Sequence, residues 1–129
     1  MNRFILDQSN VARHLTNMLI YKILRKTEWA AFHNKGETCG APVDLQDGFI
    51  HFSTAEQAAE TVARHFAGED DLMLLACDES QFGDDLKWEP SRGGALFPHL
   101  FRSLKSTDVT WAKPLPYCDN SHRFPKEMV

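Results

Sequence analysis

Long apolar runs and an excess of basic residues are both missing from this sequence. Its longest apolar stretches, such as Leu72 to Cys77, are far shorter than the roughly 20 residues that span a bilayer. No opening segment combines a basic stretch, a long apolar run and a small-residue cleavage site. The net charge is −4 and the isoelectric point is about 5.8. These absences argue against membrane insertion and against binding of duplex nucleic acid, while a small nucleotide ligand stays open.

Cysteine is also scarce, and the pattern of a metal site is incomplete. The chain has three cysteines, an odd number, which indicates a reducing, cytoplasmic setting. Cys118 and His122 form one close pair of potential ligands, whereas structural zinc sites usually show two such pairs. No metal site is therefore expected.

The size and composition of the chain are those of one domain with one core. It has 129 residues, of which 43% are hydrophobic. We expect residues 18–116 to form the domain, between an N-terminal lead over residues 1–17 and a polar, loosely ordered tail over residues 117–129. Met18 is a candidate for the biological start. The predicted fold class is α+β, with about five or six strands and two main helices.

Four segments have the composition of strands. Residues 19–24, L-I-Y-K-I-L, are rich in strand formers, and residues 86–89 form a shorter candidate stopped by a proline. The run over residues 72–77 is apolar without alternation, which predicts a central strand buried on both faces. Residues 109–116 contain two prolines, which favours a place at a sheet edge.

Two helices are indicated by their end signals. Thr27 is a candidate cap for a first helix that ends at Gly36. Thr54 and Gln57 have the spacing of a capping box for a second helix, which we expect to end at Gly68.

The stretch G-F-I-H-F-S-T, residues 48–54, places a histidine inside an apolar strand. Strand alternation puts His51 and Ser53 on one face. A buried imidazole needs a hydrogen-bond partner, so His51 is either a core residue satisfied by its neighbours or a residue that faces a ligand. Asp44 or Asp47 could complete a nucleophilic arrangement with His51 and Ser53, but the G-x-S-x-G elbow is absent and this hypothesis is minor.

Residues 88–101, W-E-P-S-R-G-G-A-L-F-P-H-L-F, mix turn formers, aromatic residues and polar groups, which favours a functional loop. Glu89, Arg92 and His99 supply a carboxylate, a cation and an imidazole, and Trp88 could stack on a base. Such groups suit recognition of a phosphorylated sugar. A structural alternative stays open for each: a surface ion pair for Glu89 and Arg92, a loop position for His99 and core packing for Trp88.

Four motifs in the chain carry a resemblance to a known family. They are I-Y-K-I-L, P-V-D-L-Q-D-G-F-I-H-F-S-T, A-R-H-F-A-G-E-D-D-L and L-K-W-E-P-S-R-G-G-A-L-F-P-H-L-F. Together they closely resemble the bacterial domain-of-unknown-function family 952, over about residues 18–116. That family is similar in fold to the ADP-ribosyltransferases, so the resemblance implies a bent, split mixed sheet around a cleft that binds NAD.

The resemblance also implies roles for particular residues. Lys22 stands where the transferases carry a His or Arg that holds the nucleotide, and Ser53 shares its strand with His51. His51 would hydrogen-bond a ribose hydroxyl, Glu89 would stabilise an oxocarbenium-like transition state, and His99 would orient the ligand or act as acid–base. Arg92 would meet a phosphate and Trp88 would contact the base.

The implied function is binding of NAD or a related nucleotide, with ADP-ribosyl transfer or NAD glycohydrolysis at the nicotinamide–ribose bond. No cofactor is fixed by the residues; NAD enters as substrate or ligand. The alternative is a non-catalytic nucleotide-binding or protein-interaction module with the same fold, which the lysine at position 22 and the proline after Glu89 favour. The sequence carries no signal for a particular oligomeric state.

Overall fold

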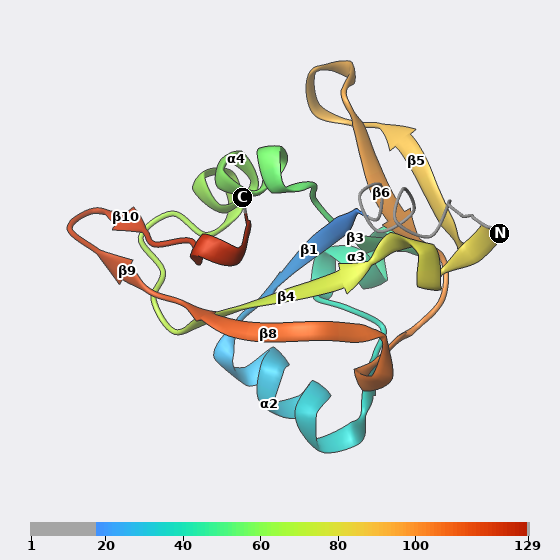
Figure 1. Ribbon diagram of the computed structural model, residues 1–129, viewed down its shortest axis with the longest axis horizontal. Coiled ribbons are helices and arrows are strands. Elements are labelled where there is room, and N and C mark those ends of the chain that lie inside the picture. Colours follow the sequence, from blue (N-terminus) through green and yellow to red (C-terminus); the bar gives the residue numbers. More distant parts are fainter. Residues whose placement is uncertain (1–17, 129) are drawn as a thin grey trace, which may run out of the picture.

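The computed structural model describes residues 18–128, so the expected N-terminal lead over residues 1–17 lies outside the described residues. Its larger sheet contains β1 (Leu19–Leu24), β4 (Leu72–Asp78) and β8 (Val109–Leu115), in the order β1-β4-β8 (Figure 1). The central place of β4 and the edge place of β8 confirm the two predictions made from composition. Leu74, Leu75 and Ala76 of β4 are completely buried, as expected for a strand covered on both faces.

The smaller sheet contains β3 (Ile50–His51), β6 (Leu96–Leu100) and β5 (Leu86–Pro90), in the order β3-β6-β5. The predicted functional loop over residues 88–101 is therefore wrong: most of it is the β5–β6 hairpin. The turn formers of this segment are concentrated at the hairpin's tip, where Ser91 N–H donates to the carbonyl of Ala95 at 2.9 Å. The flanking aromatic and apolar residues pair as strands.

The two three-stranded sheets meet at one isolated bridge, between Tyr21 of β1 and Ser53 just after β3. Each of these residues donates its N–H to the carbonyl of the other, at 2.8 and 2.9 Å. The sheet is thus split, as expected. Every pairing between the described strands is antiparallel, however, so the expectation of a mixed sheet is wrong.

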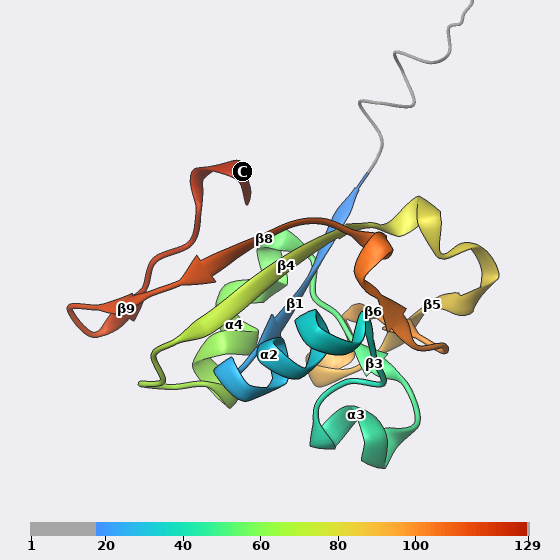
Figure 2. The ribbon, with the colours of Figure 1, turned by 90° about the horizontal axis from the view of Figure 1, so that it is seen from below.

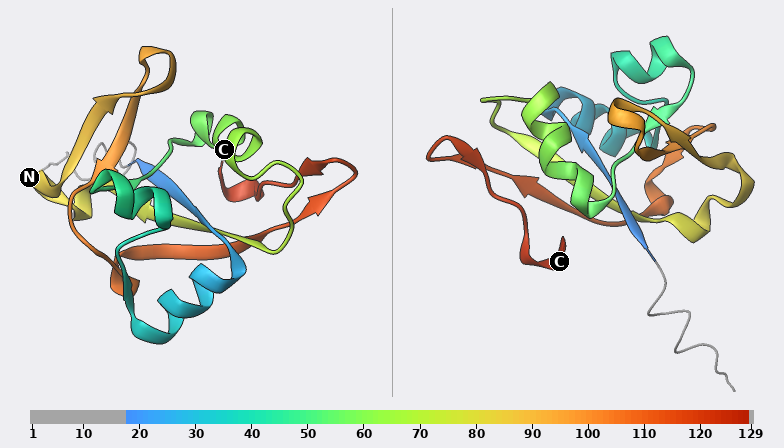
Figure 3. Two further views of the ribbon diagram at one scale, coloured as in Figure 1. Left: turned by 180° about the vertical axis from the view of Figure 1, so that it is seen from behind. Right: turned by 90° about the horizontal axis from the view of Figure 1, so that it is seen from above.

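Two short antiparallel pairs complete the strands. One joins β2 (Glu37–Thr38) to β7 (Leu104–Lys105), and the other joins β9 (Tyr117–Cys118) to β10 (Ser121–His122). Figure 2 and Figure 3 show the β9–β10 hairpin at the end of the molecule opposite to the β5–β6 hairpin. The described part of the chain also has five short 3-10 segments: η1 (Glu79–Gln81), η2 (Gly83–Asp85), η3 (Arg92–Gly94), η4 (Ser106–Asp108) and η5 (Lys126–Met128).

The two main helices are α2 (Lys26–Lys35) and α4 (Ala55–His65), and a short helix, α3 (Pro42–Asp47), lies between them in the sequence. The capping box of α4 is confirmed, because Thr54 Oγ1 accepts from the N–H of Gln57 and the Gln57 side chain accepts from the N–H of Thr54. This helix stops at His65, three residues before the expected Gly68. Among the described helices, none is long and apolar enough to cross a membrane.

The C-terminal end of α2 lies where the sequence predicted it, and the N-terminal end does not. Gly36 ends the helix in the left-handed conformation, with φ of 81°. The N-cap is Arg25 and not Thr27, two residues earlier than expected, and the Glu28 carboxylate accepts from the N–H of Arg25 at 2.8 Å.

Apolar side chains pack on both faces of the larger sheet, with α2 and α4 on opposite sides of it (Figure 1). Phe32 of α2 belongs to one cluster of buried residues, and Ala58 and Val62 of α4 belong to the other. Met128 joins the second cluster, with Phe124 packed against it. The tail is thus folded back onto the core, contrary to the expectation of loose order.

Candidate functional site

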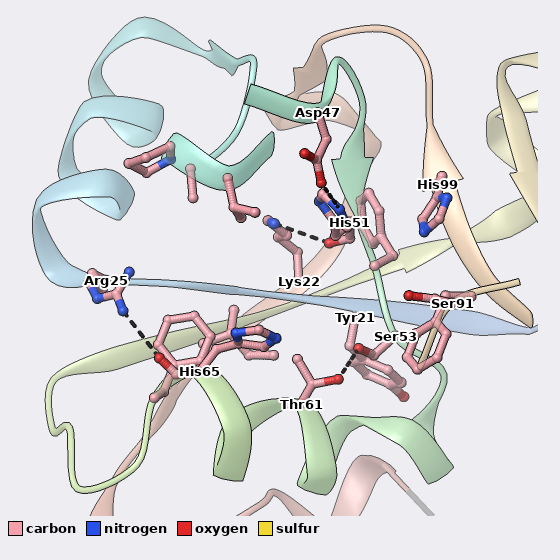
Figure 4. Close-up of a pocket in the computed structure, with 17 residues that line it drawn as sticks. Tyr21, Lys22, Arg25, Asp47, His51, Ser53, Thr61, His65, Ser91 and His99 are labelled. Atoms are coloured by element: carbon pink, nitrogen blue, oxygen red, sulfur yellow. Dashed lines mark hydrogen bonds and ion pairs between the residues drawn. The ribbon is translucent and has the colours of Figure 1, made fainter. Parts of the chain in front are cut away.

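A cavity of about 510 Å³ lies where the two sheets separate. Its walls come from β1, α3, β3, α4 and the β5–β6 hairpin (Figure 4). The lining residues are Tyr21, Lys22, Ile23, Arg25, Ala41, Pro42, Val43, Asp47, His51, Phe52, Ser53, Thr61, His65, Phe66, Ser91, Phe97 and His99. The volume falls in the range of about 300–1,000 Å³ that small-molecule sites occupy.

Asp44 organises one wall of this cavity from behind. Its carboxylate is buried and accepts four hydrogen bonds: from the N–H of Ala41 at 2.7 Å, from Lys22 Nζ at 2.7 Å, and from the N–H and Nδ1 of His51 at 3.0 and 2.6 Å. Lys22 also donates to the carbonyl of His51 at 3.1 Å. The network ties β1, α3 and β3 together and fixes the two side chains that reach the cavity.

The electrostatics of this network favour a permanently ionised Asp44. Burial by itself would raise the pKa of Asp44, but the hydrogen bond from His51 and the charge of Lys22 outweigh it and lower that pKa to about 2. Burial lowers the pKa of Lys22, against the pull of Asp44. With its acceptor positions filled, Asp44 is suited to hold neighbouring groups in place and not to exchange protons with a ligand.

His51 is held from both sides. Its Nε2 lies 3.0 Å from the Asp47 carboxylate, opposite to the contact with Asp44. The ring remains about one-third exposed, and Figure 4 shows it between Lys22 and Asp47 in the middle of the upper wall. The sequence left His51 as either a core or a ligand-facing residue; it combines a satisfied hydrogen-bond network with a place in the cavity lining.

His99 is the neighbour of His51 across the β3–β6 pair, with the ring centroids 5.3 Å apart. Its Nδ1 lies 2.7 Å from the Glu89 carboxylate, and its ring stacks on Phe49 with centroids 4.2 Å apart. Its Nε2 is buried and has no hydrogen-bond partner among the described residues. Nearly all buried polar atoms are paired, so an unpartnered nitrogen on a residue that lines the cavity is a candidate contact for a ligand.

Ser53 also lies in the cavity wall, but its hydroxyl is engaged. Its Oγ shares a hydrogen bond with Thr61 Oγ1 at 2.8 Å. The minor hypothesis of a nucleophilic serine requires a contact between Ser53 and His51. The structure supplies the carboxylate–imidazole part, between Asp44 and His51, and turns the serine hydroxyl toward α4 instead.

The candidate residues of the β5–β6 hairpin lie in different surroundings. Glu89 contacts His99 and is not among the residues that line the cavity. Trp88 packs against the first core cluster, so its placement favours core packing over base stacking. The side chain of Arg92 lies outside what the structure describes. Of the predicted residues, the structure therefore brings Lys22, His51, Ser53 and His99 together at the cavity, with Glu89 behind His99.

Several lining residues gave little signal in the sequence. Arg25 donates to both carboxylate oxygens of Glu69, at 2.8 and 3.0 Å, and its guanidinium lies 4.6 Å from the ring centre of Phe66. Thr61 and His65 reach the cavity from α4. Arg25 and His65 are 40 positions apart in the sequence. Only folding brings them to the same cavity.

Possible metal ligands are dispersed or engaged elsewhere. Within residues 18–128 no group of three or more His, Cys, Asp or Glu side chains is arranged to hold a metal ion. His122 Nε2 contacts the carbonyl of Glu69 at 2.7 Å, and Cys118 is an exposed free thiol. Burial raises the pKa of the Cys77 thiol to about 12, as expected for a core cysteine.

Comparison with known proteins identifies the family of this α+β domain. The model of the family described as "Protein of unknown function (DUF952)" matches residues 23–112, and the chain belongs to this family. The family resemblance inferred from the motifs is thereby confirmed. A search of curated proteins gave no match.

Solved structures of one relative share the fold. The chain is similar to the X-ray crystal structure of protein CC0527 from Caulobacter crescentus, with 50% identity, 81% of this chain and 93% of that chain covered, and a TM-score of 0.78. The solution NMR structure of CC0527 is also similar, with 50% identity, coverage of 81% and 90%, and a TM-score of 0.73.

Proposed function

We propose that the cavity binds a small nucleotide-type ligand, with NAD and ADP-ribose as the first candidates, in an ADP-ribosyltransferase-like domain. The observation that carries the proposal is the buried, unpartnered Nε2 of His99 in the wall of a cavity of ligand size. The split between the two sheets at the Tyr21–Ser53 bridge supports it, because the ADP-ribosyltransferase resemblance implies a cleft between separated strands.

The lining offers the mixture of surfaces that a nucleotide needs. Apolar side chains such as Phe52, Phe66 and Phe97 provide room for a base, and a few polar groups converge on them. Figure 4 shows Arg25 and His65 at the end of the cavity opposite to His99 and Ser91. A ligand with chemically distinct ends, such as a base or sugar joined to phosphates, suits this arrangement.

ADP-ribosyl transfer or NAD glycohydrolysis would need a negative group near the oxocarbenium-like transition state. Glu89, the residue expected for this task, is bonded to His99 and is absent from the lining. Asp47 is the carboxylate in the cavity wall, and it contacts His51. This arrangement favours, as a second candidate, a module that binds the nucleotide without turning it over.

Calorimetric titration of the full chain with NAD, ADP-ribose and nicotinamide tests the binding proposal. We expect saturable binding, a raised melting temperature because the ligand binds only the folded state, and loss of both effects in His99→Phe. His33→Phe is the matched control, since His33 is exposed on α2. Absence of binding at millimolar ligand, or unchanged binding in His99→Phe, would contradict the proposal.

Turnover separates the two candidates. If the cavity catalyses ADP-ribosyl transfer or glycohydrolysis, incubation with NAD releases nicotinamide, and chromatography detects it. If the domain is a binding module, NAD is recovered intact after saturating binding has been measured on the same sample. The His99→Phe protein provides the background in both cases.

A further inference from the structure

The two neighbouring imidazoles of the cavity wall differ in how many carboxylates they contact. Both nitrogens of His51 face carboxylate oxygens, of Asp44 at 2.6 Å and of Asp47 at 3.0 Å. A carboxylate only accepts hydrogen bonds, so the Nδ1 contact with Asp44 is a hydrogen bond in which the imidazole donates. The Nε2 contact with Asp47 is at ion-pair distance, so His51 has a carboxylate beside each of its nitrogens.

His99 contacts only one carboxylate, that of Glu89, through Nδ1. This contact places a proton on Nδ1, because the carboxylate is an acceptor. A second proton, on Nε2, would be a buried donor without an acceptor among the described residues. The neutral form, with the lone pair on Nε2, avoids this cost.

From this asymmetry we infer that His99 Nε2 is the hydrogen-bond acceptor of the cavity, that Glu89 is the positioning residue that fixes its tautomer, and that the ligand presents a donor group to it. A sugar hydroxyl meets that requirement. A phosphate oxygen does not, because it would face a lone pair with its own. The inference rests on the proposed function for the identity of the ligand, and on the carboxylate contacts for the chemistry of the position.

The register of the hairpin explains how Glu89 reaches His99. His99 lies opposite Lys87, and Glu89 lies opposite Phe97, so Glu89 and His99 are diagonal neighbours on one face of the β5–β6 pair. Glu89 is partly exposed and is not part of the cavity wall. It therefore acts on a ligand through the imidazole, as carboxylates behind metal-bound or catalytic histidines do.

The first test needs no ligand. A long-range ¹H–¹⁵N NMR spectrum of the full chain at neutral pH reports which ring nitrogens carry protons. We expect His99 to show a protonated Nδ1 and a bare Nε2, and Glu89→Gln to weaken this preference, because a carboxamide can donate to Nδ1 as well as accept from it. A protonated Nε2 in the wild-type protein would overturn the assignment.

The second test uses three probes: ADP-ribose, nicotinamide and inorganic sulfate. We expect the Nε2 resonance of His99 to move with ADP-ribose and to stay in place with sulfate, which has no proton to donate at neutral pH. A response to nicotinamide alone identifies an amide as the donor in place of a sugar hydroxyl. A response to sulfate alone would overturn the acceptor assignment.

Variants of the two acidic positions complete the design. Glu89→Gln should weaken ADP-ribose binding roughly two- to tenfold, the range expected for one hydrogen bond of impaired geometry. Glu60→Gln, at an exposed site on α4, should leave it unchanged. If ADP-ribose fails to bind while Nε2 is bare, the proposed function fails and the acceptor assignment stands. If ADP-ribose binds and Nε2 is protonated, the acceptor assignment alone fails.

Discussion

Replacing Asp44 with asparagine tests the buried network that shapes the cavity wall. The variant keeps the size of the side chain and removes its charge. It also replaces one acceptor oxygen with an NH₂ group, which would face the donors of Lys22 and Ala41 at the Oδ2 position or the two donors of His51 at the Oδ1 position. Lys22, itself 7% exposed, would then be a buried cation without a carboxylate partner.

Two lines of reasoning give the size of the effect. Breaking a buried ion pair by removing one partner typically costs about 3–5 kcal/mol. Independently, the lowering of the Asp44 pKa from 3.8 to about 2 corresponds to roughly 2 kcal/mol of net stabilisation by the ionised form. The second figure is smaller because the cost of burying the Asp44 charge is already subtracted from it. Since the variant also leaves Lys22 buried without its partner, the free energy of unfolding of Asp44→Asn at pH 7 should fall by about 3–5 kcal/mol.

Urea unfolding followed by tryptophan fluorescence measures this loss, and the chain has three tryptophans. Glu60→Gln is the control, since it makes the same chemical change in an exposed pair with Arg64 and should cost less than about 0.5 kcal/mol. Combining Asp44→Asn with Lys22→Met should recover part of the loss, because the unpaired cation is then gone. A loss below about 1 kcal/mol in Asp44→Asn would refute the reasoning.

Four further predictions follow from the same structure. Because the pKa of Asp44 is lowered in the folded state, its contribution is complete above about pH 4 and is lost as the pH falls through about 2; unfolding free energies at pH 5 and pH 2 should differ by about 2 kcal/mol from this group, a difference missing in Asp44→Asn. Gly40→Ala should cost more than about 1 kcal/mol in urea, since Gly40 has φ of 105° and an added Cβ would clash with the Asp44 side chain. Thr54→Ala should lower the free energy of unfolding by about 1 kcal/mol through loss of the α4 cap. Without ligand, the free energy of unfolding of His99→Phe should lie within about 1 kcal/mol of the wild-type value, because the lost Glu89 contact is offset by removal of a buried unpartnered nitrogen. A fall of more than about 2 kcal/mol would show that Nε2 has a hydrogen-bond partner in the free protein.

The parts of the fold that the sequence predicted are those with local causes. The apolar run from Leu72 to Cys77 can only be buried, and it lies at the centre of the larger sheet. The Thr54 and Gln57 pair acts within one helical turn. The segment over residues 88–101 was misread because its prolines and glycines dominate its composition, whereas strand pairing depends on a partner elsewhere. Pro98, which has no N–H, still accepts from the N–H of Phe52 through its carbonyl.

Several residues of the candidate site could be predicted from the sequence, but their arrangement in space could not. Lys22, His51 and His99 were singled out by residue type and motif, and they do line one cavity. The central place of Asp44 could not be foreseen, because it depends on the folded chain bringing this residue of α3 next to Lys22 of β1. The direction of Glu89 depends on the hairpin register, and a shift of one residue would turn it to the other face.

The way in which the two sheets are joined affects which part of the molecule unfolds locally. Ladders of backbone hydrogen bonds hold the larger sheet along six residues of β1 and most of β4 and β8. The smaller sheet joins it through the Tyr21–Ser53 bridge, the Lys22 network and side-chain packing in the first core cluster. The β3–β6–β5 sheet is thus a candidate cooperative unit whose amides exchange with solvent before those of β4. A molecule bound in the cavity touches both units at once, so its binding should slow amide exchange throughout the smaller sheet, including β5, which contributes no residue to the cavity lining.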